Sequence, residues 1–217
     1  MTAARLTSEE RLERRKARRL NEILDGAATL FSQFGYESTT ADAIASAVHL
    51  TKSALYTYVG SKEEIAVRLL ERVILQLLHE AEAIASQELT PSARIAELIV
   101  RHIVVVGNHR ASSLLFWHSE HILSAETYPD LYASRDRYEQ YLRDWIQAGI
   151  DSGVFRVRDA KLAGFMVLGS MNWVIRWFSR SGPLRIENIG ADYAAMLLGA
   201  LQAPDFEMRD RDGTPIR

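Results

Sequence analysis

Residues 39–63 read TTADAIASAVHLTKSALYTYVGSKE, and this stretch decides how the chain folds. Thr40 is placed to cap a short helix that ends near Val48, since a threonine oxygen can accept a hydrogen bond from a free N–H of the first turn. Thr51 is placed to cap a second short helix over residues 52–58 in the same way. The sequence therefore predicts two short helices joined by a tight turn.

Helical periodicity extends to both sides of this stretch. Upstream, apolar residues spaced three and four apart predict a helix from about Arg11 to Phe34, and Gly35 follows as its cap. Downstream, Ser61 is placed to cap a fourth helix that continues towards Ser86. Later helices are predicted over Pro91–His109, Ser112–Ser124, Pro129–Gly153, Asp159–Arg180 and Ile186–Gln202. No segment alternates for long with the period of a strand, so the predicted fold class is all-α.

The composition excludes several classes of protein. The 217 residues contain no cysteine, so disulfides, thiolate metal sites and a cysteine nucleophile are ruled out. The sequence has no run of about 18 apolar residues that would span a membrane, and its charged N-terminus lacks the apolar stretch of a signal peptide. A cytoplasmic protein without a membrane partner is therefore expected.

Charge is distributed unevenly along the chain. The formal net charge is −2, yet residues 1–20 hold seven basic and three acidic side chains. Residues 1–62 hold nine basic and seven acidic side chains, a balance of +2, which leaves −4 for the remainder. A basic head on an acidic body favours an anionic polymer as partner, although a solvated helix start has the same composition.

Three helices, of which the last two are short and close together, have the layout of a helix-turn-helix unit. In such a unit the second helix of the pair enters the major groove of double-stranded DNA, so residues 52–58 form the predicted recognition helix. Leu55 can face inward and hold this helix down. The side chains left for the groove and the phosphates are Thr51, Lys52, Ser53, Ala54, Tyr56, Thr57 and Tyr58. Lys62 can meet one more phosphate. Tyr56 and Tyr58 have packing of the small domain as their alternative role.

Residues from about Ile23 to Ile65 resemble the DNA-binding domain of the TetR family of transcriptional regulators. The matching positions, spaced without gaps, are Ala27–Phe31, Gly35–Tyr36, Thr39–Thr40, Ile44–Ala45, Thr51–Tyr58 and Ser61–Glu63. By this resemblance the DNA-contacting positions are Thr40, Lys52, Ser53, Tyr56, Thr57, Tyr58 and Lys62. The resemblance also implies dimerisation through the last two long helices, and a two-fold dimer would set two recognition helices about one DNA turn apart on a palindromic operator.

The sequence departs from the usual family pattern at three places. His49 stands where the glycine of the turn is common, so the turn must accept a histidine with a positive φ or differ slightly. Ser53 replaces a second frequent glycine, and Val59 replaces the usual phenylalanine. None of these changes removes a phosphate contact, and they leave the operator sequence and the docking angle open.

The C-terminal half is predicted to hold a ligand pocket and a dimer interface. The predicted helix 159–180 is apolar nearly all round, so both of its sides must be covered. One side is assigned, with residues of other helices, to an apolar pocket. The pocket residues are Phe116, Trp117, Glu120, Tyr141, Trp145, Phe165, Met166, Gly169, Asn172, Trp173 and Arg176. The dimerisation residues, on the other side and on the last helix, are Val167, Met171, Val174, Phe178, Ile189, Tyr193, Met196, Leu197 and Ala200. For any single aromatic residue, packing in the core is the alternative.

Asn172 and Arg176 are polar exceptions on an otherwise apolar helix. A buried arginine needs an anionic partner, which leaves two interpretations of Arg176. One is an internal ion pair with Glu120 or Asp144. The other is recognition of a carboxylate or phosphate on an apolar ligand.

Residues 172–177 (NWVIRW) and 182–184 (GPL) are similar to C-terminal domains of regulators of lipid or steroid catabolism. Those domains respond to acyl-CoA thioesters, whose phosphates would suit Arg176 and Arg180. With the helix-turn-helix, the similarity implies a ligand-responsive repressor that binds its operator as a homodimer and is released by a small apolar or acyl-CoA-like effector. No cofactor is expected.

Two other classes of function stay open at this point. His118 and His121 are three residues apart with Glu120 between them, a spacing that can place two metal ligands on one face of a helix. A metal-dependent helical enzyme is therefore one alternative, although the sequence lacks an HExxH signature. The other alternative is a helical scaffold that binds another protein through its apolar last helices.

The predicted domain organisation follows from these assignments. Residues 1–62 form the N-terminal arm and the helix-turn-helix DNA-binding domain, and residues 63–203 form the ligand-binding and dimerisation domain. Residues 204–217 are polar and are predicted to be a disordered tail.

Overall fold

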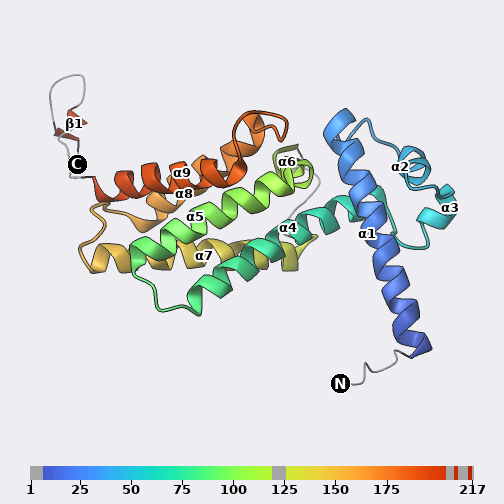
Figure 1. Ribbon diagram of the computed structural model, residues 1–217, viewed down its shortest axis with the longest axis horizontal. Coiled ribbons are helices and arrows are strands. Elements are labelled where there is room, and N and C mark those ends of the chain that lie inside the picture. The colour runs from blue at the N-terminus through green and yellow to red at the C-terminus, as the bar shows by residue number, and fades with distance from the viewer. Residues whose placement is uncertain (1–6, 119–125, 204–207, 210–214, 217) are drawn as a thin grey trace. The chain divides into compact units, whose positions relative to one another are not determined.

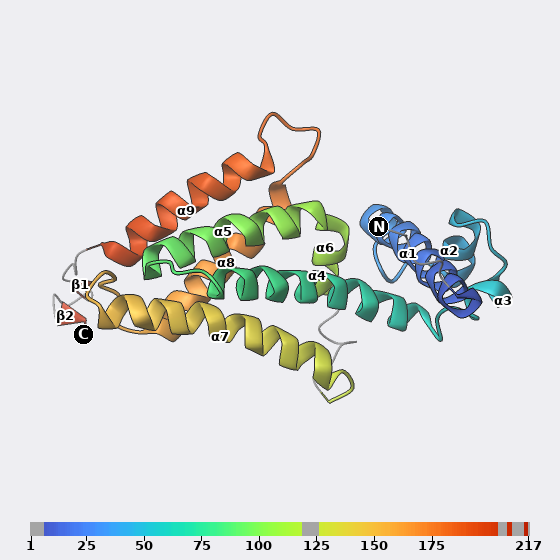
Figure 2. The ribbon, with the colours of Figure 1, turned by 60° about the horizontal axis from the view of Figure 1, so that its bottom comes forward.

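The computed structural model describes residues 7–118, 126–203, 208–209 and 215–216 (Figures 1 and 2). The chain divides into two compact units. The first comprises Met1–Ile74 and His109–Tyr132, and the second comprises Leu75–Asn108 and Ala133–Arg217.

The helices confirm the all-α class that the sequence predicts. They are α1 (Ser8–Phe34), α2 (Ala41–Ala47), α3 (Lys52–Leu55), α4 (Lys62–Ala85), α5 (Pro91–Asn108), α6 (Arg110–His118), α7 (Pro129–Asp151), α8 (Ala160–Trp177) and α9 (Ile186–Gln202). Within the described ranges, none of them is long and apolar enough to cross a membrane. Two strands of two residues each, β1 (Met208–Arg209) and β2 (Pro215–Ile216), pair antiparallel in the segment predicted to be disordered, so these four residues differ from that prediction.

The first unit is built around one apolar core shared by α1, α2, α3, the start of α4 and α6. Its buried residues include Ile23, Ala27 and Phe31 of α1, Ile44 of α2, Leu55 of α3, Ile65 and Leu69 of α4, and Leu115 of α6. α1 begins at Ser8, before the predicted start, because Thr7 and Glu10 form a capping box. The Thr7 hydroxyl accepts the N–H of Glu10 at 3.2 Å, and the Glu10 carboxylate accepts the N–H of Thr7 at 2.7 Å.

The short helices begin where their caps predict. The hydroxyl oxygens of Thr40 and Thr51 each accept the N–H three residues further on, at 3.1 Å. α3 ends at Leu55 instead of Tyr58. The N–H groups of Thr57 and Tyr58 bond to the carbonyls of Ala54 and Leu55, three residues back, and these bonds tighten the chain into turns.

His49 occupies the turn between α2 and α3 with a φ of 54°. This left-handed region favours glycine, and among the described residues His49 is the non-glycine residue found in it. Of the two alternatives for this turn, a histidine with a positive φ or a slightly different turn, the structure has the first. A β-carbon in this conformation costs about 1–2 kcal/mol, so the turn stores strain.

Replacing His49 by glycine is expected to stabilise the protein by about 0.5–1 kcal/mol, because the relieved strain exceeds the extra flexibility that glycine gives the unfolded chain. A urea titration of the free energy of unfolding measures this gain. The control is His49→Ala, which keeps a β-carbon at the same φ and should gain nothing. Equal stabilities of the glycine and alanine variants would contradict strain as the cause.

α5 is the central helix of the second unit and packs against α9 and α8. Its buried side chains recur at spacings of three and four and include Ile95, Leu98, Ile99, Ile103 and Val106. The contact with α9 depends on Gly190, because a β-carbon there would lie 3.2 Å from Cα of Val100. α9 is thus held by backbone-to-backbone packing on one side, while Met196 and Ala200 are exposed on the other.

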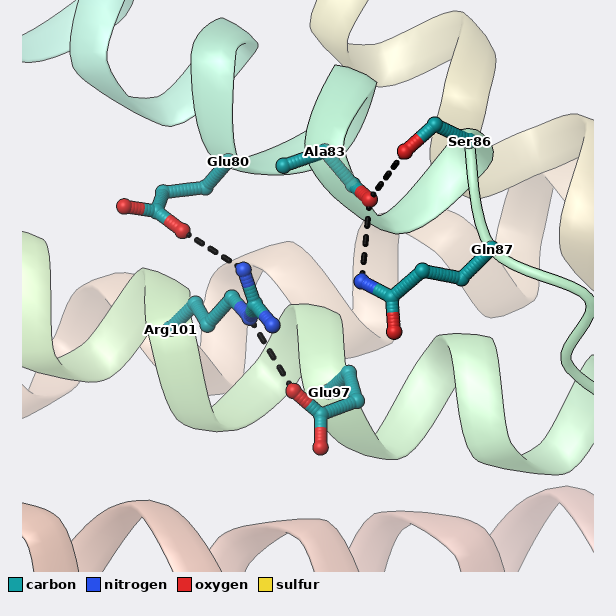
Figure 3. Close-up of polar contacts among 6 residues, drawn as sticks. All are labelled: Glu80, Ala83, Ser86, Gln87, Glu97 and Arg101. Atoms are coloured by element: carbon teal, nitrogen blue, oxygen red, sulfur yellow. Dashed lines mark hydrogen bonds and ion pairs between the residues drawn. The ribbon is translucent and has the colours of Figure 1, made fainter.

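A polar bridge joins α4 to α5 within the second unit (Figure 3). Nη1 of Arg101 donates to Glu80 of α4 at 2.9 Å, and its Nε donates to Glu97 of its own helix at 3.0 Å. At the end of α4, the side chain of Gln87 donates to the carbonyl of Ala83 at 2.9 Å. This bond satisfies a carbonyl that the helix itself leaves without a partner.

The predicted domain boundary at residue 62 falls inside the first unit. Ile65, Leu69 and Leu70 of α4 are buried in the core of α1, α2 and α3, and α6 packs against α1. The first unit therefore extends to Ile74 and includes residues 109–132. The physical reason is that the apolar face of α4 closes the core of the short helices.

Candidate nucleic-acid interface and the exposed face of the second unit

α3 and the residues on either side of it present polar side chains to solvent. Leu55 is fully buried in the core of the first unit, which confirms its inward orientation. The exposed residues are Thr51, Lys52, Ser53, Tyr56 and Thr57, and Ala54 is half-buried. Tyr58 is half-buried: its ring packs against the core, and part of the side chain stays at the surface, so its predicted contact with DNA stays a prediction. The hydroxyls and the ammonium on the open side can donate to phosphates and base edges.

Lys52 is the cation of α3, and its ammonium is held by a neighbouring helix. Its Nζ donates to the carboxylate of Asp42 on α2 at 2.8 Å, and both side chains are exposed. The hydrogen bond and the charge of Asp42 raise the pKa of Lys52. A phosphate that approaches α3 must therefore compete with Asp42 for this ammonium.

Lys62 is engaged within the first unit. Its Nζ donates to the carbonyl of Tyr36 at 2.9 Å and lies 4.2 Å from the centroid of the Tyr36 ring. Burial raises the pKa of Tyr36, and the charges of Glu63 and Glu37 add to this effect. Lys62 thereby fixes the loop between α1 and α2, in addition to the phosphate contact predicted for it.

Arg19 is a residue that sequence reasoning missed. Its Nη2 donates to the carbonyl of Val48 at 2.8 Å, and its Nη1 donates to Glu22 at 2.6 Å. Val48 is the C-cap of α2, so a cation meets the negative end of that helix. The sequence signal was a basic residue one position before the apolar stripe of α1, but its partner lies 29 residues away.

The start of α4 is fixed by two carboxylates. The Ser61 hydroxyl accepts the N–H of Glu64 at 3.0 Å, and the Glu64 carboxylate accepts the N–H of Gly60 at 2.6 Å. Burial opposes ionisation of Glu64, but the hydrogen bonds it accepts outweigh burial and lower its pKa. The hydroxyl of Tyr128 donates to Glu63 at 2.6 Å, and this bond raises the pKa of Tyr128 to about 12. Sequence reasoning missed the tyrosine, since nothing local marks it.

The structure turns α8 the other way round from the sequence prediction. Five residues assigned to the pocket lie on the solvent side of α8, namely Phe165, Met166, Gly169, Trp173 and Arg176. Trp173 is 54% exposed and Phe165 is 51% exposed. The physical reason is that α5 packs against the opposite side of α8, where shorter side chains fit more closely. The predicted pocket residues Tyr141 and Trp145 lie on α7, where their ring centroids are 5.5 Å apart.

The predicted dimerisation residues of α8 are correspondingly inside the second unit. Val167, Met171 and Val174 are fully buried in its core, and Phe178 is 6% exposed. On α9, Ile189 and Leu197 are also buried, whereas Tyr193, Met196 and Ala200 reach the surface. Val167, Met171, Val174, Phe178 and Ile189 therefore pack inside their own chain, which disagrees with their predicted place in a dimer interface. Leu197 is mostly buried but lines a surface hollow, so its role and those of Tyr193, Met196 and Ala200 stay predictions.

The exposed sides of α8 and α9 adjoin one another. A hollow of about 520 Å³ lies between them, lined by Gly169, Ser170, Trp173, Tyr193, Met196 and Leu197. Trp177 at the end of α8 is 43% exposed and Met196 is 60% exposed. We call the exposed apolar residues Phe165, Met166, Trp173, Trp177 and Met196 the outer face. Exposed apolar side chains gathered in this way mark an interaction surface.

A buried polar triad joins three helices of the second unit. Nδ1 of His102 on α5 is 2.8 Å from the hydroxyl of Tyr138 on α7, and its Nε2 is 3.2 Å from Oδ1 of Asn172 on α8. Burial lowers the pKa of His102 to about 4, against the opposing effect of the Asn172 bond. Burial also raises the pKa of Tyr138. The predicted pocket residue Asn172 thus belongs to a triad of neutral side chains in which both ring nitrogens of His102 have a partner.

Arg176 is exposed, so it does not need an internal anionic partner as a buried arginine would. Its predicted contact with a carboxylate or phosphate of a ligand stays a prediction. Asp144, one of its two predicted partners, accepts a hydrogen bond from Gln140 instead. The other, Glu120, lies outside the described residues, as does His121, and the side chains of Phe116, Trp117 and His118 are likewise not described. Among the residues that are described, no three acidic or histidine side chains are grouped to hold a metal ion.

Comparisons with known proteins agree over most of the chain. Residues 23–69 match the family model for bacterial regulatory proteins of the tetR family, and residues 88–201 match the model for a tetracyclin repressor-like C-terminal domain. The HTH-type transcriptional repressor KstR2 of Mycobacterium tuberculosis is 27% identical over 188 residues, which are 84% of this chain and 92% of KstR2.

Two solved structures are similar in fold. The TetR family transcriptional regulator PfmR from Thermus thermophilus is 34% identical with a TM-score of 0.75, covering 81% of this chain and 96% of PfmR. AibR, solved with isovaleryl coenzyme A and operator DNA, is 24% identical with a TM-score of 0.73, covering 86% of this chain and 100% of AibR.

Proposed function

The chain belongs to the TetR family of bacterial regulatory proteins, and on that premise we propose that it is a repressor that binds a palindromic operator as a homodimer and is released by a small apolar effector of the acyl-CoA class. The observation that carries the proposal is α3, whose polar side chains stand exposed on the fully buried anchor Leu55. The DNA-contacting residues proposed are Thr40, Thr51, Lys52, Ser53, Ala54, Tyr56, Thr57, Tyr58 and Lys62.

The homodimer is supported by the outer face. Its aromatic and methionine side chains bury large apolar areas when a partner covers them, which is favourable by about 25 cal/mol per Å². Gly169 and Gly199 add to this, because a β-carbon at either would meet nothing within 4 Å in this chain. A second copy covering α8 and α9 through a two-fold axis would bring two α3 helices to one operator.

The effector class is supported by chemistry at the end of α8. Arg176 is exposed, and Arg180 donates to the carbonyl of Asn108 at 2.9 Å. Guanidinium groups beside apolar side chains suit a ligand that joins a phosphate-rich head to an apolar tail. The fold of AibR, which this chain shares, accommodates isovaleryl coenzyme A together with operator DNA.

We also propose that the protein acts by binding alone. The metal-dependent enzyme and the helical scaffold are the competing functions. Metal in the purified protein at one ion per chain would favour the enzyme, and a stable complex with a different protein would favour the scaffold.

The testing experiment is a fluorescence anisotropy titration of the purified protein against duplexes from its own upstream region, at two salt concentrations. Salt-sensitive binding in the nanomolar range is expected. Straight-chain and steroid-derived acyl-CoAs are then added, and at least one of them should release the DNA. Binding that resists every thioester would overturn the effector class, and absence of binding to operator and random duplexes alike would overturn the DNA-binding function.

Removing the competitor of Lys52 is expected to tighten DNA binding. In Asp42→Asn the ammonium is free for a phosphate and one negative charge is gone, so we expect about a tenfold gain in affinity and a salt dependence steeper by about 0.9 per chain. Lys52→Gln should do the reverse. The double variant serves as control, since without Lys52 the exchange at position 42 should have a smaller effect. Weaker binding by Asp42→Asn would mean that Asp42 orients Lys52 and does not compete for it.

A further inference from the structure

The N-terminal part of α1 carries four arginines on one face. Residues 8–18 are exposed throughout, and the first buried residue of the helix is Ile23. Arg11, Arg14, Arg15 and Arg18 follow the spacing i, i+3, i+4, i+7, so at 100° per residue they share an arc of about 100°. We call these four residues the arginine stripe.

Most of the stripe is uncompensated. The nearby carboxylates have other partners. Glu13 pairs with Lys16 at 3.1 Å, and the carboxylate of Glu10 accepts the N–H of Thr7. Within the stripe, Arg18 pairs with Glu22 at 3.2 Å. Arg11, Arg14 and Arg15 form no ion pair with any residue that the structure describes. Three free guanidinium groups therefore stand in solvent on this face.

This arrangement is unfavourable for the isolated chain. Like charges three and four residues apart on a helix repel, and cations near the N-terminus oppose the helix dipole. The extension buries no apolar face in return, since its large apolar residue Leu12 is 52% exposed. A bound anion would relieve the repulsion and match both charge and dipole.

We propose that the arginine stripe is a second DNA-binding surface, which contacts duplex phosphates flanking the base pairs that α3 reads. This inference rests on the proposed function, because it assigns further contacts to the same operator. α1 and α3 belong to one compact unit, so DNA bound at α3 lies within reach of a helix that extends from the same core. Figure 1 shows the start of α1 projecting beyond α2 and α3.

Duplex DNA fits the stripe in dimension and chemistry. Arg11 and Arg18 are separated by about 10 Å along the helix axis at 1.5 Å per residue, and a DNA strand carries a phosphate about every 3.4 Å of duplex axis. The stripe can therefore meet about three phosphates, which guanidinium groups bind in bidentate geometry. A membrane surface is a poorer match, because an interfacial helix needs an apolar face.

The test compares the full-length protein with the variant Arg11→Gln, Arg14→Gln, Arg15→Gln, since glutamine keeps the helix propensity. Operator affinity is measured at five salt concentrations on duplexes with long flanks. The slope of log K against log salt should fall by about 2–3 per chain, at about 0.9 per lost phosphate contact. Affinity should fall at least about tenfold near 0.15 M salt, while discrimination between operator and random DNA is unchanged.

Matched controls separate a local contact from net charge. The variant Arg137→Gln, Arg156→Gln, Arg185→Gln makes the same charge change at exposed arginines of the second unit and should keep the wild-type slope. On a duplex trimmed to the half-sites, the stripe variant and wild type should bind alike. If the wild type binds the operator and the stripe variant has the same salt slope, the stripe proposal alone is overturned. That result is also the one expected if the stripe binds an acidic protein instead of DNA. Failure of the wild type to bind any duplex would overturn the proposed function and the stripe with it.

Discussion

Trp173→Glu is expected to convert the protein to a monomer and to weaken operator binding by at least about 100-fold. Trp173 lines the hollow between α8 and α9 and is 54% exposed, so the single chain tolerates the change. In a dimer that covers the outer face, the glutamate would be buried without a partner, which costs several kcal/mol. Loss of the second half-site contact then removes an avidity of about 10²–10⁴.

Sedimentation velocity measures the oligomeric state, and fluorescence anisotropy measures the operator affinity. The matched control is Leu184→Glu. It places the same charge at an apolar residue that is 57% exposed, in the loop that connects α8 to α9 and outside the outer face. This control should remain dimeric and bind normally. A Trp173→Glu protein that stays dimeric would place the interface elsewhere on the chain.

The protein is also expected to lose about 3 kcal/mol of stability through His102 as the pH falls from 7 to 4. Burial lowers the pKa of His102 to about 4 in the folded chain, from an ordinary value of 6.5. Between pH 6.5 and pH 4, His102 is protonated in the unfolded chain and stays neutral in the folded chain. The free energy of unfolding therefore decreases as the pH falls from 7 towards 4. Each unit of pKa difference is worth about 1.4 kcal/mol.

Urea titrations at half-unit intervals of pH measure this loss. His102→Gln keeps a neutral side chain able to bond to Tyr138 and Asn172, and it should show a curve flatter by about 3 kcal/mol over the same range. The control is His79→Gln on the exposed side of α4, which should follow the wild type. Parallel curves for wild type and His102→Gln would show that His102 does not stay neutral.

The features that could be predicted from sequence are those decided by local interactions. The starts of α2 and α3 depend on Thr40 and Thr51, each of which bonds to an N–H three residues away. The positive φ of His49 is likewise a property of one short turn. Long-range partners carry no such signal. Lys62 meets a carbonyl 26 residues away, and Arg19 meets one 29 residues away.

The orientation of α8 could not be predicted, for a different physical reason. The sequence of a helix with one apolar face predicts which side is buried, but α8 is apolar on two opposite sides. The choice between Val167 inside and Trp173 outside is made by the shape of α5, which no pattern within α8 encodes. Side-chain size is misleading here, since the larger residue is the exposed one.

In the triad of His102, Tyr138 and Asn172, each hydrogen bond has a defined donor and acceptor. Because Oδ1 of Asn172 can only accept, Nε2 of His102 carries the hydrogen and Nδ1 accepts the hydroxyl of Tyr138. A slip of α8 by one turn along α5 would bring Leu168 or Arg176 to His102 instead. Neither can accept an N–H, and a buried donor left alone costs about 1–3 kcal/mol. The triad therefore favours the observed alignment of α8 along α5 over alignments shifted by one turn.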